Sequence, residues 1–101
     1  MAMRYIIRRT KPEDLSDIKT QVSNLDSVLE KATDGARKTV PVTFNNLDYL
    51  TYQFQTRKVG TDFIWVCPTI ELVAGDEKAL FALTDKFKLP IPAHLAHLKN
   101  A

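Results

Sequence analysis

Consecutive segments in the middle of the chain carry strand patterning, and no helical pattern interrupts them. The stretches 38–44 and 49–57 alternate apolar and polar residues, as strands do when one face is buried and the other is wet. The stretch 63–67, FIWVC, is apolar on both faces, which predicts a central strand that ends at Pro68. The stretch 69–73, TIELV, is another short strand or an extended connection. Such a run of strands favours an antiparallel sheet.

A helical pattern precedes this run. Apolar residues recur at spacings of three and four, at Leu15, Ile18, Val22, Leu25 and Leu29. Thr10 and Glu13 have the spacing of a capping box at the start, and Gly35 suits the left-handed end of a helix. The pattern therefore predicts one helix of about 20 residues, or about 30 Å.

Shorter elements lie on either side. Residues 4–9, RYIIRR, predict a short strand before the long helix. Asp76 is a suitable cap for a second helix, whose inner stripe is Ala79, Leu80, Leu83 and Phe87. A short terminal helix is expected after Pro92. Pro41 cannot donate to a ladder, which predicts that its strand lies at an edge.

These elements predict an α+β fold. The expected order is strand, long helix, three or four strands, helix and short terminal helix. We expect residues 1–101 to form a single domain, an antiparallel sheet of about four strands covered by a long N-terminal helix and a second C-terminal helix. One helix face and one sheet face packed together account for nearly every periodic apolar residue.

Composition narrows the class of protein. Hydrophobic residues make up 45% and charged residues 26%, which is the profile of an ordinary globular domain. The net charge of +2 neither requires nor excludes a polyanionic partner. The longest apolar run is far too short to span a bilayer, and the N-terminus lacks the apolar core of a signal peptide. We therefore expect a cytoplasmic protein with no membrane partner.

Two pieces of the chain resemble the GNAT family of acetyltransferases. IIRRTKPEDLSDI, residues 6–18, is similar to the first strand and helix start of that family, and WVCPTIELVAGDEKALFAL, residues 65–83, to its fourth strand and following helix. The resemblance implies a pyrophosphate loop of the pattern R/Q-x-x-G-x-G/A. Only Gly75 could match a glycine of that loop, and Asp76 and Glu77 bring negative charge to it. The resemblance thus implies a degenerate acetyltransferase-like domain without activity.

The residue types used in catalysis and metal binding are sparse. Cys67 ends an apolar run, so we expect a buried structural thiol and no nucleophile. His94 and His97 would share a helix face, but a zinc site needs three or four ligands, so we expect them on an exposed polar face. No acid–base pair or phosphate loop stands out. We predict no catalytic site, no metal and no cofactor.

Basic residues gather at three places near strand ends or turns: Arg8, Arg9 and Lys11; Arg37 and Lys38; and Arg57 and Lys58. From Pro12 onward, the order of helix, three strands and helix resembles a double-stranded-RNA-binding domain in outline. In this chain, however, the last helix begins with acids where that family has lysines. Because the basic clusters could contact phosphates, a nucleic-acid-binding domain that uses them is an alternative function.

Polar residues alternate along the stretch 49–57, where Gln53, Gln55 and Arg57 share a face that Tyr49 also joins. A flat polar sheet face is a suitable docking surface. Our main expectation is a small non-enzymatic protein that acts by macromolecular binding, such as an inhibitor, an immunity protein, an adaptor or a phage or mobile-element accessory factor. Its expected partner is another protein with an acidic surface, and a homodimer through an open strand edge is an alternative assembly.

Overall fold

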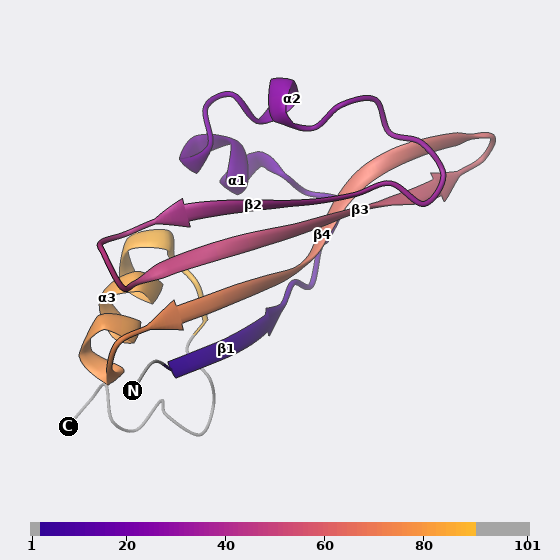
Figure 1. Cartoon of the computed structure of the whole chain (residues 1–101). Helices are drawn as coiled ribbons and strands as arrows, with labels where there is room; N and C mark the ends of the chain where they lie inside the picture. The colour runs from indigo at the N-terminus through magenta and orange to yellow at the C-terminus, as the bar shows by residue number, and fades with distance from the viewer. Residues whose placement is uncertain (1–2, 91–101) are drawn as a thin grey trace.

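Four strands form one antiparallel sheet in the computed structural model, which describes residues 3–90. The strands are β1 (Met3–Arg8), β2 (Arg37–Thr43), β3 (Tyr49–Val59) and β4 (Asp62–Ala74). They pair in the order β1-β4-β3-β2, so the first strand lies beside the last (Figure 1). Three helices complete the described part of this small single-domain α+β fold. The predicted fold class and the four-stranded sheet are confirmed.

Two short helices replace the predicted long one, and this prediction was wrong. Helix α1 spans Ser16–Gln21 and helix α2 spans Leu25–Val28, with Val22 in an extended conformation after α1. The residues between them include Ser23 and Asn24, whose short polar side chains compete with the backbone for hydrogen bonds and so disfavour a helix interior. The apolar stripe nevertheless packs into the core, because its members from Ile18 to Leu29 are buried despite the break and Leu15 is partly buried against them.

The start of α1 also differs from the predicted capping box. Leu15 occupies the cap position and makes no side-chain cap bond. Instead, Asp14 Oδ1 accepts hydrogen bonds from the Ser16 backbone N–H (3.1 Å) and hydroxyl (2.6 Å). These bonds lower the pKa of the Asp14 carboxyl, because they stabilise its charged form. The cap is therefore Leu15, five residues later than the predicted cap Thr10.

Strand β4 passes through Pro68, which was expected to end it. Gln53 faces Thr69 and Gln55 faces Val66, so the single residue Phe54 lies opposite both Cys67 and Pro68. The extra residue makes a β-bulge in β4, and a bulge is one of the few places where a strand tolerates proline. FIWVC and TIELV are consequently one continuous strand of 13 residues.

Proline also marks the open edge of β2. Just after that strand, the Phe44 N–H donates to the Asp48 carbonyl (2.8 Å). Because N–H groups alternate along a strand, Pro41 has its nitrogen on the side away from β3 and costs the sheet no ladder bond. Among the described residues β2 is an edge strand, as predicted. The missing N–H also hinders another strand from pairing there.

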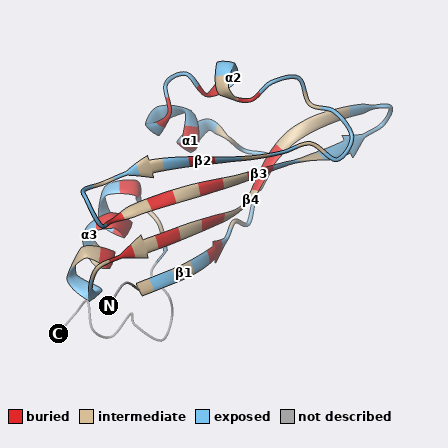
Figure 2. Cartoon of the chain, in the orientation of Figure 1, coloured by how far each residue is buried: buried red, intermediate tan, exposed pale blue. Residues whose placement is uncertain are grey.

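Both helical regions pack on the same face of the sheet, which we call the inner face. Ile18 and Leu25 from the first region and Leu80 and Leu83 from the second join one core cluster. The strands contribute alternate residues to that cluster, including Val40, Leu50, Tyr52, Phe54, Ile70 and Leu72. Figure 2 shows the resulting alternation of buried and less buried positions along β3 and β4. No helix among residues 3–90 crosses the opposite face, which faces the viewer in Figure 1.

Helix α3 spans Glu77–Phe87 and agrees with the predicted second helix. Asp76 caps it, because its side chain accepts a hydrogen bond from the Ala79 N–H (2.8 Å). The helix ends at Lys88, whose φ of 54° is left-handed, and the Leu89 N–H donates to the Thr84 carbonyl (2.8 Å). The predicted terminal helix, with His94 and His97, lies outside the described residues.

Beyond the four-stranded region, residues 56–65 of β3 and β4 continue as a two-stranded arm that turns at Gly60. The Thr56 hydroxyl donates to the Thr33 carbonyl (2.6 Å), and Trp65 Nε1 donates to the Glu30 carbonyl (2.5 Å). These two bonds attach the arm to the segment that follows α2.

Candidate binding surface

The strand residues that alternate away from the helices form a second surface, which we call the outer face. The registers place on it Arg4, Ile6 and Arg8 of β1, Ile64, Val66, Thr69, Glu71 and Val73 of β4, Tyr49, Thr51, Gln53, Gln55 and Arg57 of β3, and Arg37, Thr39, Pro41 and Thr43 of β2. Within the part of the chain that the structure describes, this is the one sheet face without a covering layer.

One end of the outer face is partly apolar. Tyr49 pairs with Val73, and both side chains are partly buried. Ile6, on the neighbouring strand, is 50% exposed. Arg4 and Glu71 form an ion pair (2.6 Å) in the same area. Tyrosine and arginine are among the side chains enriched at protein interfaces.

The other end of the outer face carries three arginines. Arg8 shares a row with Gln53, and Arg37 shares the next row with Gln55. Arg57 lies two residues further along β3, near Glu13, with Arg57 Nη2 3.8 Å from the Glu13 carboxylate. Strands about 4.8 Å apart with a rise of about 3.4 Å per residue place these three backbone positions within about 20 Å of one another. One ligand surface can therefore reach all of them.

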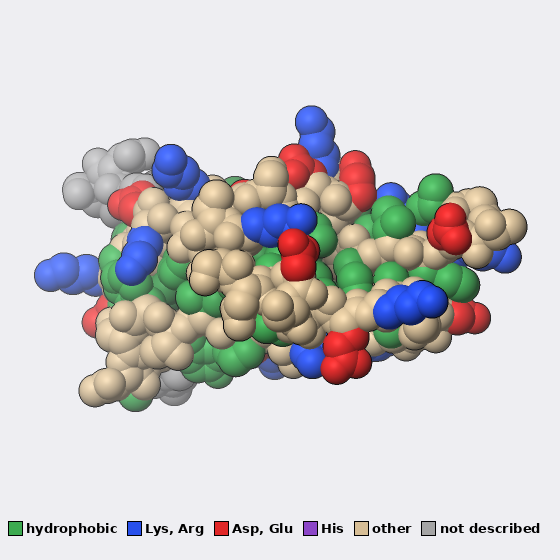
Figure 3. All heavy atoms as spheres, turned by 90° about the horizontal axis from the view of Figure 1, so that it is seen from above, with side chains coloured by type: hydrophobic (Ala, Val, Ile, Leu, Met, Phe, Trp, Pro, Cys, Tyr) green, Lys and Arg blue, Asp and Glu red, His purple; other side chains and the backbone are tan. Residues whose placement is uncertain are grey.

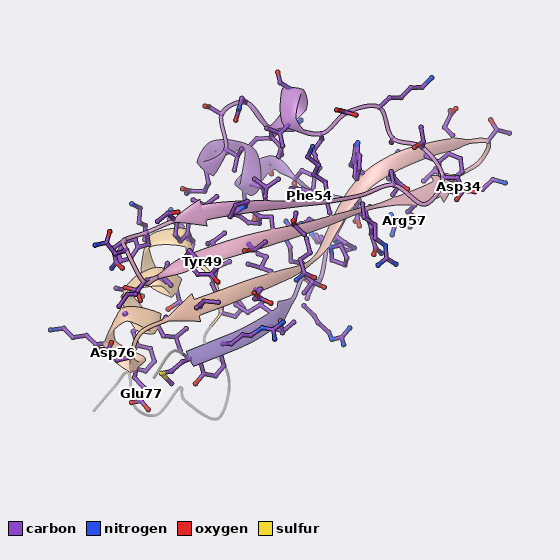
Figure 4. All side chains as sticks on the ribbon, viewed as in Figure 1. Asp34, Tyr49, Phe54, Arg57, Asp76 and Glu77 are labelled. Atoms are coloured by element: carbon purple, nitrogen blue, oxygen red, sulfur yellow. The ribbon has the colours of Figure 1, made fainter. Side chains whose placement is uncertain are left out.

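The structure thus sorts the ten residues proposed from the sequence. Six of them share the outer face: Arg8, Arg37, Tyr49, Gln53, Gln55 and Arg57. Lys38 and Lys58 alternate to the other side of their strands, so they do not join the arginines. Arg9 and Lys11 lie after β1, in the connector that leads to α1. Figure 4 labels Tyr49 and Arg57 on β3 and shows how far apart they lie along the strand.

Arg9 has a structural role that the sequence did not reveal. Its guanidinium donates to the Cys67 carbonyl (3.0 Å) and the Asp14 carbonyl (2.5 Å) and forms an ion pair with Asp17 (2.9 Å). The Cys67 N–H donates in turn to the Pro12 carbonyl (2.8 Å). The connector therefore provides the hydrogen bonds that the bulge in β4 would otherwise lack, and the Arg9 side chain, 11% exposed, contributes little to the surface.

Cys67 itself lies in the core. Its side chain is fully buried, and burial raises the pKa of the thiol. The expectation of a buried thiol is therefore confirmed. A buried neutral thiol is a poor nucleophile. Residues 3–90 contain no group of three or more His, Cys, Asp and Glu side chains that could hold a metal ion.

Acidic residues occupy the N-terminus of α3, where the acetyltransferase resemblance would place a phosphate. Asp76 caps this helix and Glu77 lies in its first turn (Figure 4). The cap uses the Ala79 N–H that a bound phosphate would need.

One further basic residue joins the sequence-predicted set only in three dimensions. Lys88, at the end of α3, lines a hollow together with Arg8, Arg9 and Lys11. No local spacing could have indicated this, because the contact depends on where α3 ends relative to the connector.

No known protein family, curated protein or solved structure matches the chain. No helix within residues 3–90 is long and apolar enough to cross a membrane.

Proposed function

We propose that this protein catalyses no reaction and acts by binding another protein through its outer face. The observation that carries the proposal is the one-sided packing of the sheet: the helices within residues 3–90 all lie on the inner face, and none of them covers the outer face. Arginine and tyrosine, which that face carries, are types that protein interfaces favour.

The dimensions of the outer face suit a small interface. Four strands span about 19 Å, and the 11 residues of β3 span about 37 Å. A rectangle of these sides is on the order of 700 Å², which is an upper limit because β1 and β2 are shorter than β3. Standard interfaces bury about 800 Å² on each partner. We therefore expect a reversible complex and not an obligate dimer.

Charge gives the second candidate function, nucleic-acid binding. Arg8, Arg37 and Arg57 on one face could contact phosphates. Two acidic residues reduce the positive field, however, because Glu71 pairs with Arg4 and Glu13 lies beside Arg57. The side seen from above, which carries α1 and α2 and is not the outer face, likewise shows acidic and basic side chains interspersed (Figure 3). We place a protein with an acidic surface first.

The test compares capture of partners by variants of the full chain. Wild type, the triple variant Arg8→Glu, Arg37→Glu and Arg57→Glu, and the control Lys78→Glu on exposed α3 are immobilised and exposed to lysate from the source cells, with and without nuclease treatment. Wild type and the control should retain the same protein, and the triple variant should lose it. Equal retention of the partner by all three proteins would show that the outer face is not the binding surface. Retention that disappears after nuclease treatment and falls steeply with salt would favour nucleic acid.

A further inference from the structure

A hollow of about 260 Å³ lies between the connector that follows β1 and the end of α3. We call it the connector hollow. Its accessible apolar lining comes from Leu89 and Pro90 and from the small exposed part of Ile7, whereas Ile70 of the inner sheet face is fully buried behind them. Its volume equals that of about eight water molecules at liquid density, which is enough for an organic molecule of similar heavy-atom count.

Cations from separate parts of the chain line this hollow. Arg8 ends β1, Lys11 lies in the connector and Lys88 ends α3. Within residues 3–90, no ion pair or side-chain hydrogen bond is formed by any of the three side chains. These cations are therefore available to a ligand.

The two acids that line the hollow already have partners. Asp17 pairs with Arg9 (2.9 Å), so those two charges offset each other. Asp14 accepts two hydrogen bonds from Ser16. The hollow therefore has three cations without an ion-pair partner and one carboxylate, that of Asp14, which is hydrogen-bonded to the start of α1. It retains an excess of positive charge.

Lys88 adds an independent observation. Its φ of 54° lies in the left-handed region, which favours glycine because other residues bring Cβ close to the following carbonyl. The chain has lysine there, and its side chain lines the hollow. A cation at the C-terminus of a helix also stabilises the helix dipole, so the test must separate that effect from ligand binding.

We propose that the connector hollow binds the carboxylate of a small aliphatic acid, with the carboxylate between Arg8, Lys11 and Lys88 and the aliphatic part against Ile7, Leu89 and Pro90. Ligand sites of this type combine an apolar wall with a few converging polar groups. Arg8 belongs to the outer face as well, whereas Lys11 and Lys88 do not, so variants of Lys88 test the hollow without altering the surface on which the proposed function rests.

The experiment follows amide chemical shifts of the full chain by NMR during titration. Hexanoate has eight heavy atoms, hexanol is its neutral counterpart, and inorganic phosphate is an anion without an aliphatic part. Hexanoate should shift the amides of residues 7–11 and 88–89 and bind at least tenfold more tightly than hexanol. No shift at millimolar hexanoate, or equal binding of hexanol, would overturn the proposal. Binding of phosphate without hexanoate would overturn the assignment to an aliphatic acid.

Matched variants separate charge from structure. Lys88→Gly suits the left-handed backbone, so it should keep or raise the melting temperature. It should lower the affinity for hexanoate at least tenfold. Lys88→Arg should retain binding, and Lys19→Ala, in α1, should change neither quantity. Unchanged hexanoate affinity in Lys88→Gly would show that Lys88 does not hold the ligand and would overturn the site.

Discussion

The two faces of the sheet are built from alternating residues of the same strands, yet they differ in what covers them. Leu72 faces inward and is fully buried beneath the helices, whereas its neighbours Glu71 and Val73 face outward and remain partly exposed. Stability should therefore depend on the inner face, and binding on the outer one. A substitution can test this division by moving a single residue along a strand.

The largest expected effect is on the inner face. Leu72→Ala should lower the free energy of unfolding by about 2–5 kcal/mol, because it leaves a cavity in a fully packed site. Thr51→Ala on the outer face should change it by no more than about 0.5 kcal/mol. Urea unfolding of both variants measures the difference. Similar losses in the two variants would contradict the division between the faces.

Arg9 should show the next largest effect. Arg9→Ala removes donors to the Cys67 and Asp14 carbonyls, and hydrogen bonds from charged groups contribute about 1.5–3 kcal/mol. Lys11→Ala, two residues along the connector, should be nearly neutral. Denaturant unfolding distinguishes a structural arginine from a surface one, and a loss below about 0.5 kcal/mol in Arg9→Ala would assign Arg9 to the surface after all.

The cap of α3 should have a smaller effect. Asp76→Ala removes the acceptor of the Ala79 N–H and should cost about 1 kcal/mol, whereas Asp76→Asn keeps an acceptor and should cost less. Thermal unfolding of the pair measures this difference. Equal melting temperatures for Asp76→Ala and wild type would mean that the cap contributes nothing.

The smallest effect on stability should come from the buried hydroxyl of Tyr52, because it acts only at alkaline pH. Burial first, and then the charge of Asp17, raise the pKa of Tyr52 to about 12. An unfolded tyrosine ionises near pH 10, so the unfolded state releases its proton first and this contribution to stability is lost as pH rises from about 10 to about 12. Tyr52→Phe should reduce that alkaline loss in stability-versus-pH curves, and Tyr49→Phe on the outer face should not. Parallel curves for wild type and Tyr52→Phe would refute this assignment.

The strands and α3 could be predicted because their signals are local. Alternation in 49–57 and the cap at Asp76 each depend on a few neighbouring residues. The membership of the inner face followed from the same alternation. Sharing of the outer face by Arg8, Arg37 and Arg57 did not, because it depends on the register between strands.

The wrong predictions have one local and one tertiary cause. The stripe from Leu15 to Leu29 fits one helix, but Ser23 and Asn24 disfavour a helix interior, and the chain breaks at Val22 while the stripe still packs in the core. Pro68, in contrast, stays within β4 because a bulge accepts it and the connector provides hydrogen bonds to Cys67. The position of Lys88 beside the connector likewise depends on how α3 packs. These last two features depend on residues far apart in the sequence, which periodicity does not describe.

The most direct test of the central claim is site-specific photocrosslinking in the source cells. p-Benzoylphenylalanine replaces Tyr49 on the outer face in one version of the full chain and Lys78 on exposed α3 in another. We predict that irradiation links the Tyr49 position to one protein species and gives no such product from the Lys78 position. A product from Lys78 alone, or the same product from both positions, would contradict the assignment of binding to the outer face.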